Sequence, residues 1–221
     1  MFDPIVKTGF RSPNFDSTEI PVEFLVLHYT ACTLERTLEI FLDPQSKKCA
    51  HFVVAEDGSI RDLGDFLNGP IKQGAHAGES YFKSTSTDEE FHGFNRFSIG
   101  VELVNLNGNI RPYTELQYQA LSFLIGYLKE RFPKLKDPDR IVGHEHIAGH
   151  RGKADPGRQF DWPRLFKEVY AITSYPKRPP LCSEEQAEKL MSVVSTKTDQ
   201  FENPLFWSRL SAELETSLRG K

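Results

Sequence analysis

The chain has 221 residues, which is enough for one full-sized domain with an appendage. Its 27 Lys and Arg residues and 31 Asp and Glu residues leave a net charge of −4, too small to make nucleic acid or an anionic membrane the main partner. No apolar run approaches the ~20 residues that span a bilayer, and residues 1–15 lack the pattern of a secretory signal.

The three cysteines are Cys32, Cys49 and Cys182, and none belongs to a Cys-x-x-Cys pair. An odd, sparse set of this kind is not a disulfide framework, and it fits a reducing compartment better than an oxidising one.

The first forty residues predict an arm, a strand and a helix. Residues 1–20 are polar and irregular. A compact apolar run over residues 23–27 predicts a buried strand that ends at His28. Thr33 is a suitable N-cap for a helix, which the sequence Asp43-Pro44 ends.

The next segment predicts a hairpin, a long loop and a further strand. Residues 50–54 form an apolar run, and Asp57-Gly58 is a strong signal for a tight turn into a return strand. Residues 64–97 are rich in Gly, Ser, Thr and Asn, which predicts a loop region. Residues 97–104 predict the next strand.

The second half alternates between helices and one short strand. Helical spacing of leucines predicts a helix over residues 113–132, and residues 140–142 predict a short buried strand. Another short helix is expected over residues 161–172, and the proline-rich residues 175–180 are typical of a linker. Residues 183–186 resemble a capping box that opens a helix.

Alternating strands and helices predict an α/β domain. We expect an N-terminal arm over residues 1–20, the main domain over residues 21–175 and a helical extension over residues 176–221.

The segment over residues 143–157 is the most informative part of the chain. It holds three histidines, a lysine and an aspartate among several glycines, and no hydrophobic period runs through it. We therefore expect a loop rather than a helix or strand. A loop that leaves a strand end with imidazole and carboxylate groups is a natural place for a metal ion.

A zinc hydrolase needs three protein ligands and one open coordination position. His28 and His144 each follow a predicted strand, and Asp155 comes 11 residues after His144, so the intervening loop can fold back on one ion. His146 and His150 compete with His144 for this role. A histidine at a strand end is more often a hydrogen-bonding cap, and an aspartate before a proline can simply start a turn. Spacing alone leaves the metal site and the structural interpretation open.

Two further charged residues are candidates for catalysis. Strand alternation places Glu102 on the face opposite Val101 and Leu103, where it is either paired structurally or lines a cleft. A partly desolvated glutamate has a raised pKa, which suits a general base. Lys153, two residues before Asp155, can stabilise an oxyanion, although a loop lysine is more often plain surface charge.

At these residues the chain resembles the zinc-dependent N-acetylmuramoyl-L-alanine amidases of the amidase-2 (AmpD/AmiD-like) family, which is related in fold to the peptidoglycan recognition proteins. Ordered blocks within residues 22–166 carry the resemblance: residues 25–31, 50–54 with 57–58, 76–78, 95–103, 113–118 and 143–157. The implied fold is a central mixed β-sheet flanked by helices. The family often has Trp before its His-Ala-Gly block, where this chain has Ala75.

The resemblance implies one Zn²⁺ per chain, with His28, His144 and Asp155 as its ligands. Glu102 corresponds to the acidic residue that activates the attacking water, and Lys153 to the residue that steadies the oxyanion. Three further residues flank the family's cleft and would hold the sugar or the peptide carboxylates: His76, Asn95 and Arg151.

The implied reaction is hydrolysis of the amide between N-acetylmuramic acid, or its 1,6-anhydro form, and L-alanine in muropeptides or peptidoglycan. A non-catalytic peptidoglycan-fragment binding protein on the same fold is the alternative, and the complete ligand set favours the enzyme. A zinc peptidase of the common class is disfavoured, because the chain has no His-Glu-x-x-His motif.

We expect a cytoplasmic location, with the periplasm or cell envelope as the alternative, because residues 25–31 look closer to the envelope-located branch of the family. The tail after residue 176 matches no wall-binding module, and its apolar residues predict packing onto the domain or onto a second subunit. The oligomeric state stays open.

Overall fold

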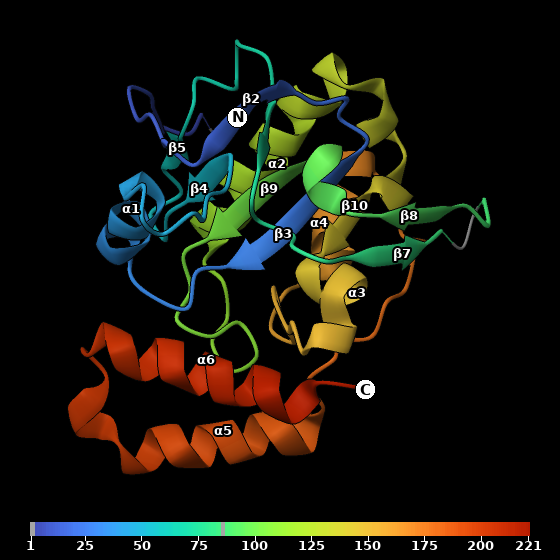
Figure 1. Cartoon of the computed structure of the whole chain (residues 1–221). Coiled ribbons are helices and arrows are strands. Elements are labelled where there is room, and N and C mark those ends of the chain that lie inside the picture. The colour runs from blue at the N-terminus through green and yellow to red at the C-terminus, as the bar shows by residue number, and fades with distance from the viewer. Residues whose placement is uncertain (1–2, 85–86) are drawn as a thin grey trace.

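The computed structural model describes residues 3–84 and 87–221. In these ranges the chain forms a six-stranded sheet of order β1-β5-β4-β9-β3-β10 with helices around it (Figure 1). The strands of this sheet are Val6–Lys7 (β1), Phe24–Tyr29 (β3), Phe52–Val54 (β4), Ile60–Asp62 (β5), Ser98–Leu103 (β9) and Ile141–Gly143 (β10). The expected α/β fold with a central mixed sheet is confirmed.

The remaining elements surround this sheet. Two small antiparallel sheets pair Phe15–Glu19 (β2) with Lys72–Gly74 (β6) and Tyr81–Lys83 (β7) with Glu90–His92 (β8). The α-helices are Leu34–Leu42 (α1), Glu115–Arg131 (α2), His144–Ala148 (α3), Trp162–Tyr170 (α4), Glu184–Thr196 (α5) and Pro204–Leu218 (α6). The short 3-10 helices are Phe94–Arg96, Pro133–Lys136, Pro138–Arg140, Gly149–Arg151 and Thr198–Gln200.

Strand β3 lies inside the sheet between two parallel neighbours, β9 and β10. In the β3–β9 pair, His28 is opposite Glu102, and in the β3–β10 pair, Leu27 is opposite Gly143. Side chains of paired residues in neighbouring strands point to the same face of a sheet. The register therefore places His28 and Glu102 side by side near the carboxyl ends of their strands.

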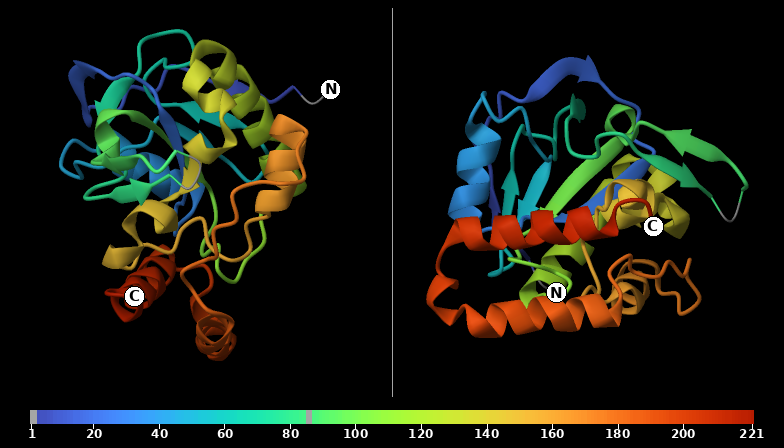
Figure 2. Two further views of the ribbon diagram at one scale, coloured as in Figure 1. Left: turned by 90° about the vertical axis from the view of Figure 1, so that its right-hand side faces the viewer. Right: turned by 60° about the horizontal axis from the view of Figure 1, so that its bottom comes forward.

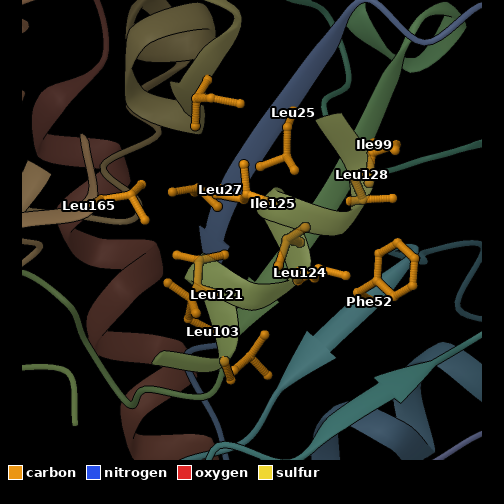
Figure 3. Packing of buried hydrophobic residues seen from close by; sticks show 14 of the residues in the cluster. Leu25, Leu27, Phe52, Ile99, Leu103, Leu121, Leu124, Ile125, Leu128 and Leu165 are labelled. Atoms are coloured by element: carbon orange, nitrogen blue, oxygen red, sulfur yellow. The ribbon is translucent and has the colours of Figure 1, made fainter. Parts of the chain in front are cut away.

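The two faces of β3 carry different cores. Leu25 and Leu27 pack on the face covered by helix α2, whose Leu121, Leu124 and Leu128 are fully buried against the sheet (Figure 3). Burial of one such side chain contributes about 1.5–3 kcal/mol, so this face anchors the sheet.

On the other face, Phe24 and Val26 join a second core with residues of α3 and of the β7–β8 hairpin. His28 continues this face at the end of the strand. Alternation within one strand thus puts the imidazole on the face opposite the main core.

The helix starts follow the capping signals of the sequence. Thr33 accepts a hydrogen bond from the backbone N–H of Arg36, and Thr114 and Ser183 each form a capping box with the glutamine three residues later. Such caps typically contribute about 1 kcal/mol each and account for the confirmed starts of α1, α2 and α5.

Three segments differ from the sequence expectations. The irregular arm contains β1 and β2, and the expected loop over residues 64–97 contains β6, β7 and β8. The expected loop over residues 143–157 starts with the last residue of β10, Gly143, and then contains α3 and the 3-10 helix Gly149–Arg151. These elements have two to five residues, too few to show a hydrophobic period. Residues 1–2 and 85–86 of these segments lie outside the described residues.

Helices α5 and α6 lie side by side at one end of the molecule, with α6 between α5 and the rest of the fold (Figures 1 and 2). Their apolar residues form one buried cluster with Ala154 of the main domain: Leu190, Val194, Trp207, Leu210, Leu214 and Leu218. The expectation that the tail packs onto its own domain therefore agrees with these contacts. Within the described ranges, no α-helix is both long and apolar enough to cross a membrane.

Candidate active site

Neighbouring strands bring two histidines to the same end of the sheet. His28 is the fifth residue of β3, and His144 is the first residue of α3, directly after β10. Leu27 and Gly143 are opposite each other in the β3–β10 pair. His28 and His144, the next residue in each segment, therefore lie next to each other at this end of the sheet.

The chain after α3 folds back to bring Asp155 to these histidines. The backbone N–H of Glu145 donates to the carbonyl of Asp155 at 2.9 Å, and the Tyr113 hydroxyl donates to the carbonyl of Pro156 at 2.6 Å. The side-chain amide of Asn109 donates to the carbonyl of Ala154 at 3.1 Å. Contacts from several elements therefore fix the position of the carboxylate.

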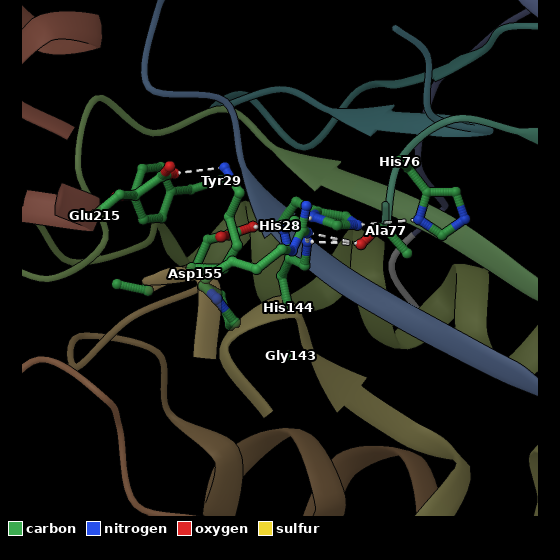
Figure 4. Close-up of polar contacts among 12 residues, drawn as sticks. His28, Tyr29, His76, Ala77, Gly143, His144, Asp155 and Glu215 are labelled. Carbon is green, nitrogen blue, oxygen red and sulfur yellow. Dashed lines mark hydrogen bonds and ion pairs between the residues drawn. The ribbon is translucent and has the colours of Figure 1, made fainter. Parts of the chain in front are cut away.

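Three side-chain atoms converge in a small triangle (Figure 4). His28 Nδ1 lies 3.1 Å from His144 Nδ1 and 2.9 Å from Asp155 Oδ2, and His144 Nδ1 lies 3.1 Å from Asp155 Oδ2. In a tetrahedral zinc site with bonds of 2.0–2.1 Å, ligand atoms are about 3.3 Å apart. The spacing of the three atoms fits ligation of one such ion.

The outer nitrogens of both rings have their own partners. His144 Nε2 lies 3.3 Å from the carbonyl of Ala77, and His28 Nε2 lies 3.2 Å from Nδ1 of His76. Arg151 Nη2 also lies 3.3 Å from His144 Nε2. In the tautomers whose Nε2–H donates to His76 and to the Ala77 carbonyl, the Nδ1 lone pairs are free. Two nitrogen lone pairs and a carboxylate oxygen then point toward the centre of the triangle, which is the arrangement that a cation requires. In metal sites, hydrogen bonds to the outer ring nitrogens usually hold the ligands in such an orientation.

The pKa shifts in this triangle favour the ligating protonation states. Burial, and next the neighbouring His144, lower the pKa of His28 to about 4, against the opposing effect of Asp155. Burial acts to raise the pKa of Asp155, but His144 and His28 outweigh it and hold that pKa below its ordinary value. A neutral histidine and an ionised aspartate are the forms that bind a metal ion.

Glu102 lies on β9 next to His28 in register. The residue is half-buried, and its Oε2 atom is buried without a hydrogen-bond partner among the described residues. Burial, and next the charge of Asp155, raise the pKa of Glu102 to about 8, against the opposing effect of Lys153 and Lys48. A buried carboxylate oxygen without a partner is costly for folding, which is typical of a functional group.

A cleft of about 470 Å³ opens over this cluster, a size that suits a small-molecule ligand. His28, Glu102, His144, Lys153 and Asp155 all line it. The structure therefore brings together the five residues singled out as ligands or catalytic groups.

The three expected substrate-binding residues, His76, Asn95 and Arg151, also line this cleft. Several of their hydrogen-bonding groups already bind other groups of the protein. Asn95 Oδ1 accepts from the backbone N–H groups of His76 and Ala77 at 3.2 and 2.8 Å. Arg151 Nη2 donates to the carbonyl of Ala77 at 2.9 Å, while its Nε is buried without a partner in the part of the chain that the structure describes.

The competing histidines lie elsewhere. His146 Nδ1 accepts from the backbone N–H of Gly143 at 2.9 Å, and its ring packs on Trp162. His150 is exposed to solvent. In the described residues neither histidine belongs to the cluster around Asp155.

Sequence reasoning missed the contribution of helix α6. Glu215 pairs with Lys153 at 2.7 Å, and Ser208, Ser211 and Ala212 line the same cleft. Ser211 Oγ also accepts from Tyr29 Oη at 3.4 Å. The only local signal was the amphipathic pattern of the tail, which predicts packing but not the surface on which it packs.

Comparison with known proteins places this geometry in a family. Residues 18–158 match the family described as N-acetylmuramoyl-L-alanine amidase. The chain is 35% identical over 126 residues to the 1,6-anhydro-N-acetylmuramyl-L-alanine amidase AmpD of Salmonella typhimurium, covering 57% of this chain and 59% of that protein. It is 35% identical over 131 residues to AmpD of Enterobacter cloacae, covering 58% and 64%. The chain thus spans about three fifths of the length of these relatives.

Solved structures show the same fold. The crystal structure of an AmpD selenomethionine derivative superimposes with a TM-score of 0.60 at 27% identity, covering 76% of this chain and 96% of that one. AmiD of E. coli, in complex with anhydro-N-acetylmuramic acid-L-Ala-D-gamma-Glu-L-Lys, gives a TM-score of 0.57 at 24% identity, covering 82% and 66%. The family match extends over more than half of the chain and includes every residue of the cluster. The chain therefore belongs to the N-acetylmuramoyl-L-alanine amidase family.

Proposed function

We propose that the protein is a zinc hydrolase that cleaves the amide bond between N-acetylmuramic acid, or its 1,6-anhydro form, and L-alanine. The observation that carries this proposal is the triangle of His28, His144 and Asp155 atoms, 2.9–3.1 Å apart. Beside it lies Glu102, whose buried Oε2 atom has no hydrogen-bond partner among the described residues. Family membership supports the reaction class.

The two Nδ1 atoms and the carboxylate would hold one Zn²⁺, leaving a coordination position for the reactants. When bound, Zn²⁺ polarises a carbonyl oxygen and makes water acidic enough to lose a proton near neutral pH. The ligand set contains no thiolate, and its imidazole and carboxylate donors suit zinc.

Glu102 would transfer the proton of the attacking water, and Lys153 would stabilise the negative charge on the carbonyl oxygen. Ionised Glu102 accepts a proton from the attacking water and then delivers it to the nitrogen of L-alanine as the C–N bond breaks. The Lys153 ammonium stabilises the negative charge that develops on the carbonyl oxygen. Both side chains line the cleft above the triangle, so each can reach an amide held there.

We propose a 1,6-anhydro-muropeptide as the substrate, because the relatives at 35% identity are named as amidases of that compound class. A stem peptide carries carboxylates, and the side chain of Arg151 lines the cleft. A guanidinium is well suited to bind a carboxylate.

The test is mass spectrometry of the products after the zinc-loaded protein is mixed with anhydro-muramyl-tripeptide, with and without a zinc chelator. We expect free tripeptide, and we expect the chelator to abolish its release. Absence of release by protein shown to contain zinc and to bind the compound would replace the proposal with a non-catalytic binding protein on the same fold.

A further inference from the structure

Helix α6 lies outside residues 18–158, the part of the chain that matches the family, yet it forms one wall of the cleft. We propose that Glu215 of this helix is a positioning residue that holds the ammonium group of Lys153 over the metal-ligand cluster. Helix α6, which packs on α5, then contributes to the active site. This inference rests on the proposed function, which gives Lys153 its role.

The contact between the two side chains is a close ion pair. Glu215 Oε1 lies 2.7 Å from Lys153 Nζ, and the two side chains are only 24% and 27% exposed. Charge-assisted hydrogen bonds of this length are about twice as strong as neutral ones. An ammonium has three N–H donors, so a single bond to Glu215 leaves two for a substrate oxygen.

A lysine in this place needs an external support. Its ammonium group is carried on a flexible four-carbon chain, and fixing that chain in one rotamer costs about 2 kcal/mol of conformational entropy. Stabilisation of a developing oxyanion requires a donor that is already in position, because a displacement of about 1 Å costs up to about 100-fold in rate. The carboxylate of Glu215 supplies that support from the wall opposite the sheet.

The backbone of α6 is fixed against the loop that carries Lys153. Gly152 has φ +84°, and a Cβ built there would lie 1.9 Å from the carbonyl oxygen of Glu215. The helix therefore approaches the catalytic loop closely enough that only glycine fits. Trp207 and Leu214 of α6 are buried with Ala154, between Lys153 and Asp155, in the same apolar cluster.

Polar contacts fix the cleft-facing side of the helix as well. Ser211 Oγ accepts hydrogen bonds from Tyr29 Oη at 3.4 Å and from Asn107 Nδ2 at 3.3 Å, and Ser208 Oγ donates to the carbonyl of Ala31 at 3.3 Å. Tyr29 follows the candidate ligand His28, so α6 is tied to the two chain segments that carry cluster residues. Glu215 thus stands on a rigid support.

The experiment is a double-mutant cycle with Glu215→Gln and Lys153→Ala in the zinc-loaded full chain, with anhydro-muramyl-tripeptide as substrate. We expect E215Q to lower kcat about 10-fold with KM changed less than about 2-fold, and K153A to lower kcat about 100-fold or more. If Glu215 acts through Lys153, E215Q has no further effect in the K153A background.

The control is Glu213→Gln, the same neutralisation at an exposed position of the same helix, which we expect to leave kcat unchanged. Zinc content and melting temperature are measured for every variant, and both should match the wild type in E215Q. Crystal structures of wild type and E215Q give a readout that does not need turnover: Lys153 Nζ should leave its position when the carboxylate is removed.

Three results would overturn the inference: an unchanged kcat in E215Q, a higher KM at constant kcat, or an equal loss from E215Q with and without Lys153. The second would make Glu215 a substrate-binding residue, and the third would make it a structural one. If the wild type itself fails to release tripeptide, the proposed function fails, while the position of Lys153 in the two crystal structures still tests the pairing.

Discussion

The candidate metal ligands and the C-terminal helix α6 reach the same cleft in different ways. His28 and His144 are positioned by the register of parallel strands, inside the part of the chain that matches the family. Glu215 is positioned by side-chain packing and by one close backbone approach at Gly152, outside that part. Backbone hydrogen bonds between strands align the first group, whereas the position of Glu215 depends on the packing of particular side chains.

The largest effect is expected from removal of a cluster ligand. His28→Ala, His144→Ala or Asp155→Ala should abolish zinc binding and lower activity by at least about 1,000-fold, because the metal's charge stabilisation is worth several kcal/mol. Zinc content by elemental mass spectrometry and the rate of tripeptide release check this. Turnover by metal-free D155A would contradict the mechanism.

Substitution of Glu102 separates catalysis from metal binding. Glu102→Gln should keep zinc and lower activity about 100- to 10,000-fold, since the amide cannot accept the proton of the attacking water. The measurement is kcat together with zinc content and melting temperature. An activity within about 3-fold of the wild type would exclude Glu102 as the general base.

Glycine-to-alanine substitutions test how α6 is held. Gly152→Ala introduces a Cβ 1.9 Å from the carbonyl oxygen of Glu215 at φ +84°, so we expect a loss of about 2 kcal/mol or more and a displaced helix. The matched control is Gly126→Ala in α2, where a Cβ meets nothing within 4 Å and should stabilise the helix by about 1 kcal/mol.

Denaturant unfolding of the two variants measures both changes in the free energy of unfolding. Equal stability of G152A and the wild type would show that α6 approaches the loop that carries Lys153 less closely than the structure has it.

The smallest effect is a pH dependence. Glu102 must be ionised to act as a base, so kcat/KM should rise with pH and level off once it is ionised. Bound Zn²⁺ would lower the pKa of Glu102 from about 8, which places the midpoint of the rise between its ordinary 4.5 and about 8. The pH profile of E102Q should lack this rise, and persistence of the rise would assign it to another group.

In the metal-free protein the raised pKa of Glu102 also makes stability depend on pH. Activity should rise with pH, whereas stability should fall. Folding raises the pKa of Glu102 from 4.5 to about 8, so the folded state favours the protonated form. The free energy of unfolding of the wild type relative to E102Q should therefore fall as pH rises from about 4.5 to about 8.

Much of the fold was predictable because its signals are local. The apolar run before His28, the turn at Asp57-Gly58 and the capping residue Thr114 each specify an element within a few positions of themselves. Elements of two to five residues, such as α3, were not predictable, since so short a segment is stabilised by its surroundings rather than by its own sequence.

The candidate site divides in the same way. The sequence by itself determined which residue types were available, a histidine after each of two strands and an aspartate in a glycine-rich segment, and the family blocks singled out His144. The tertiary structure places His144 rather than His146 against Asp155, and only the tertiary structure shows that Glu215, 62 positions from Lys153, lines the cleft. A contact between residues so far apart leaves no local pattern, because it depends on how whole elements pack.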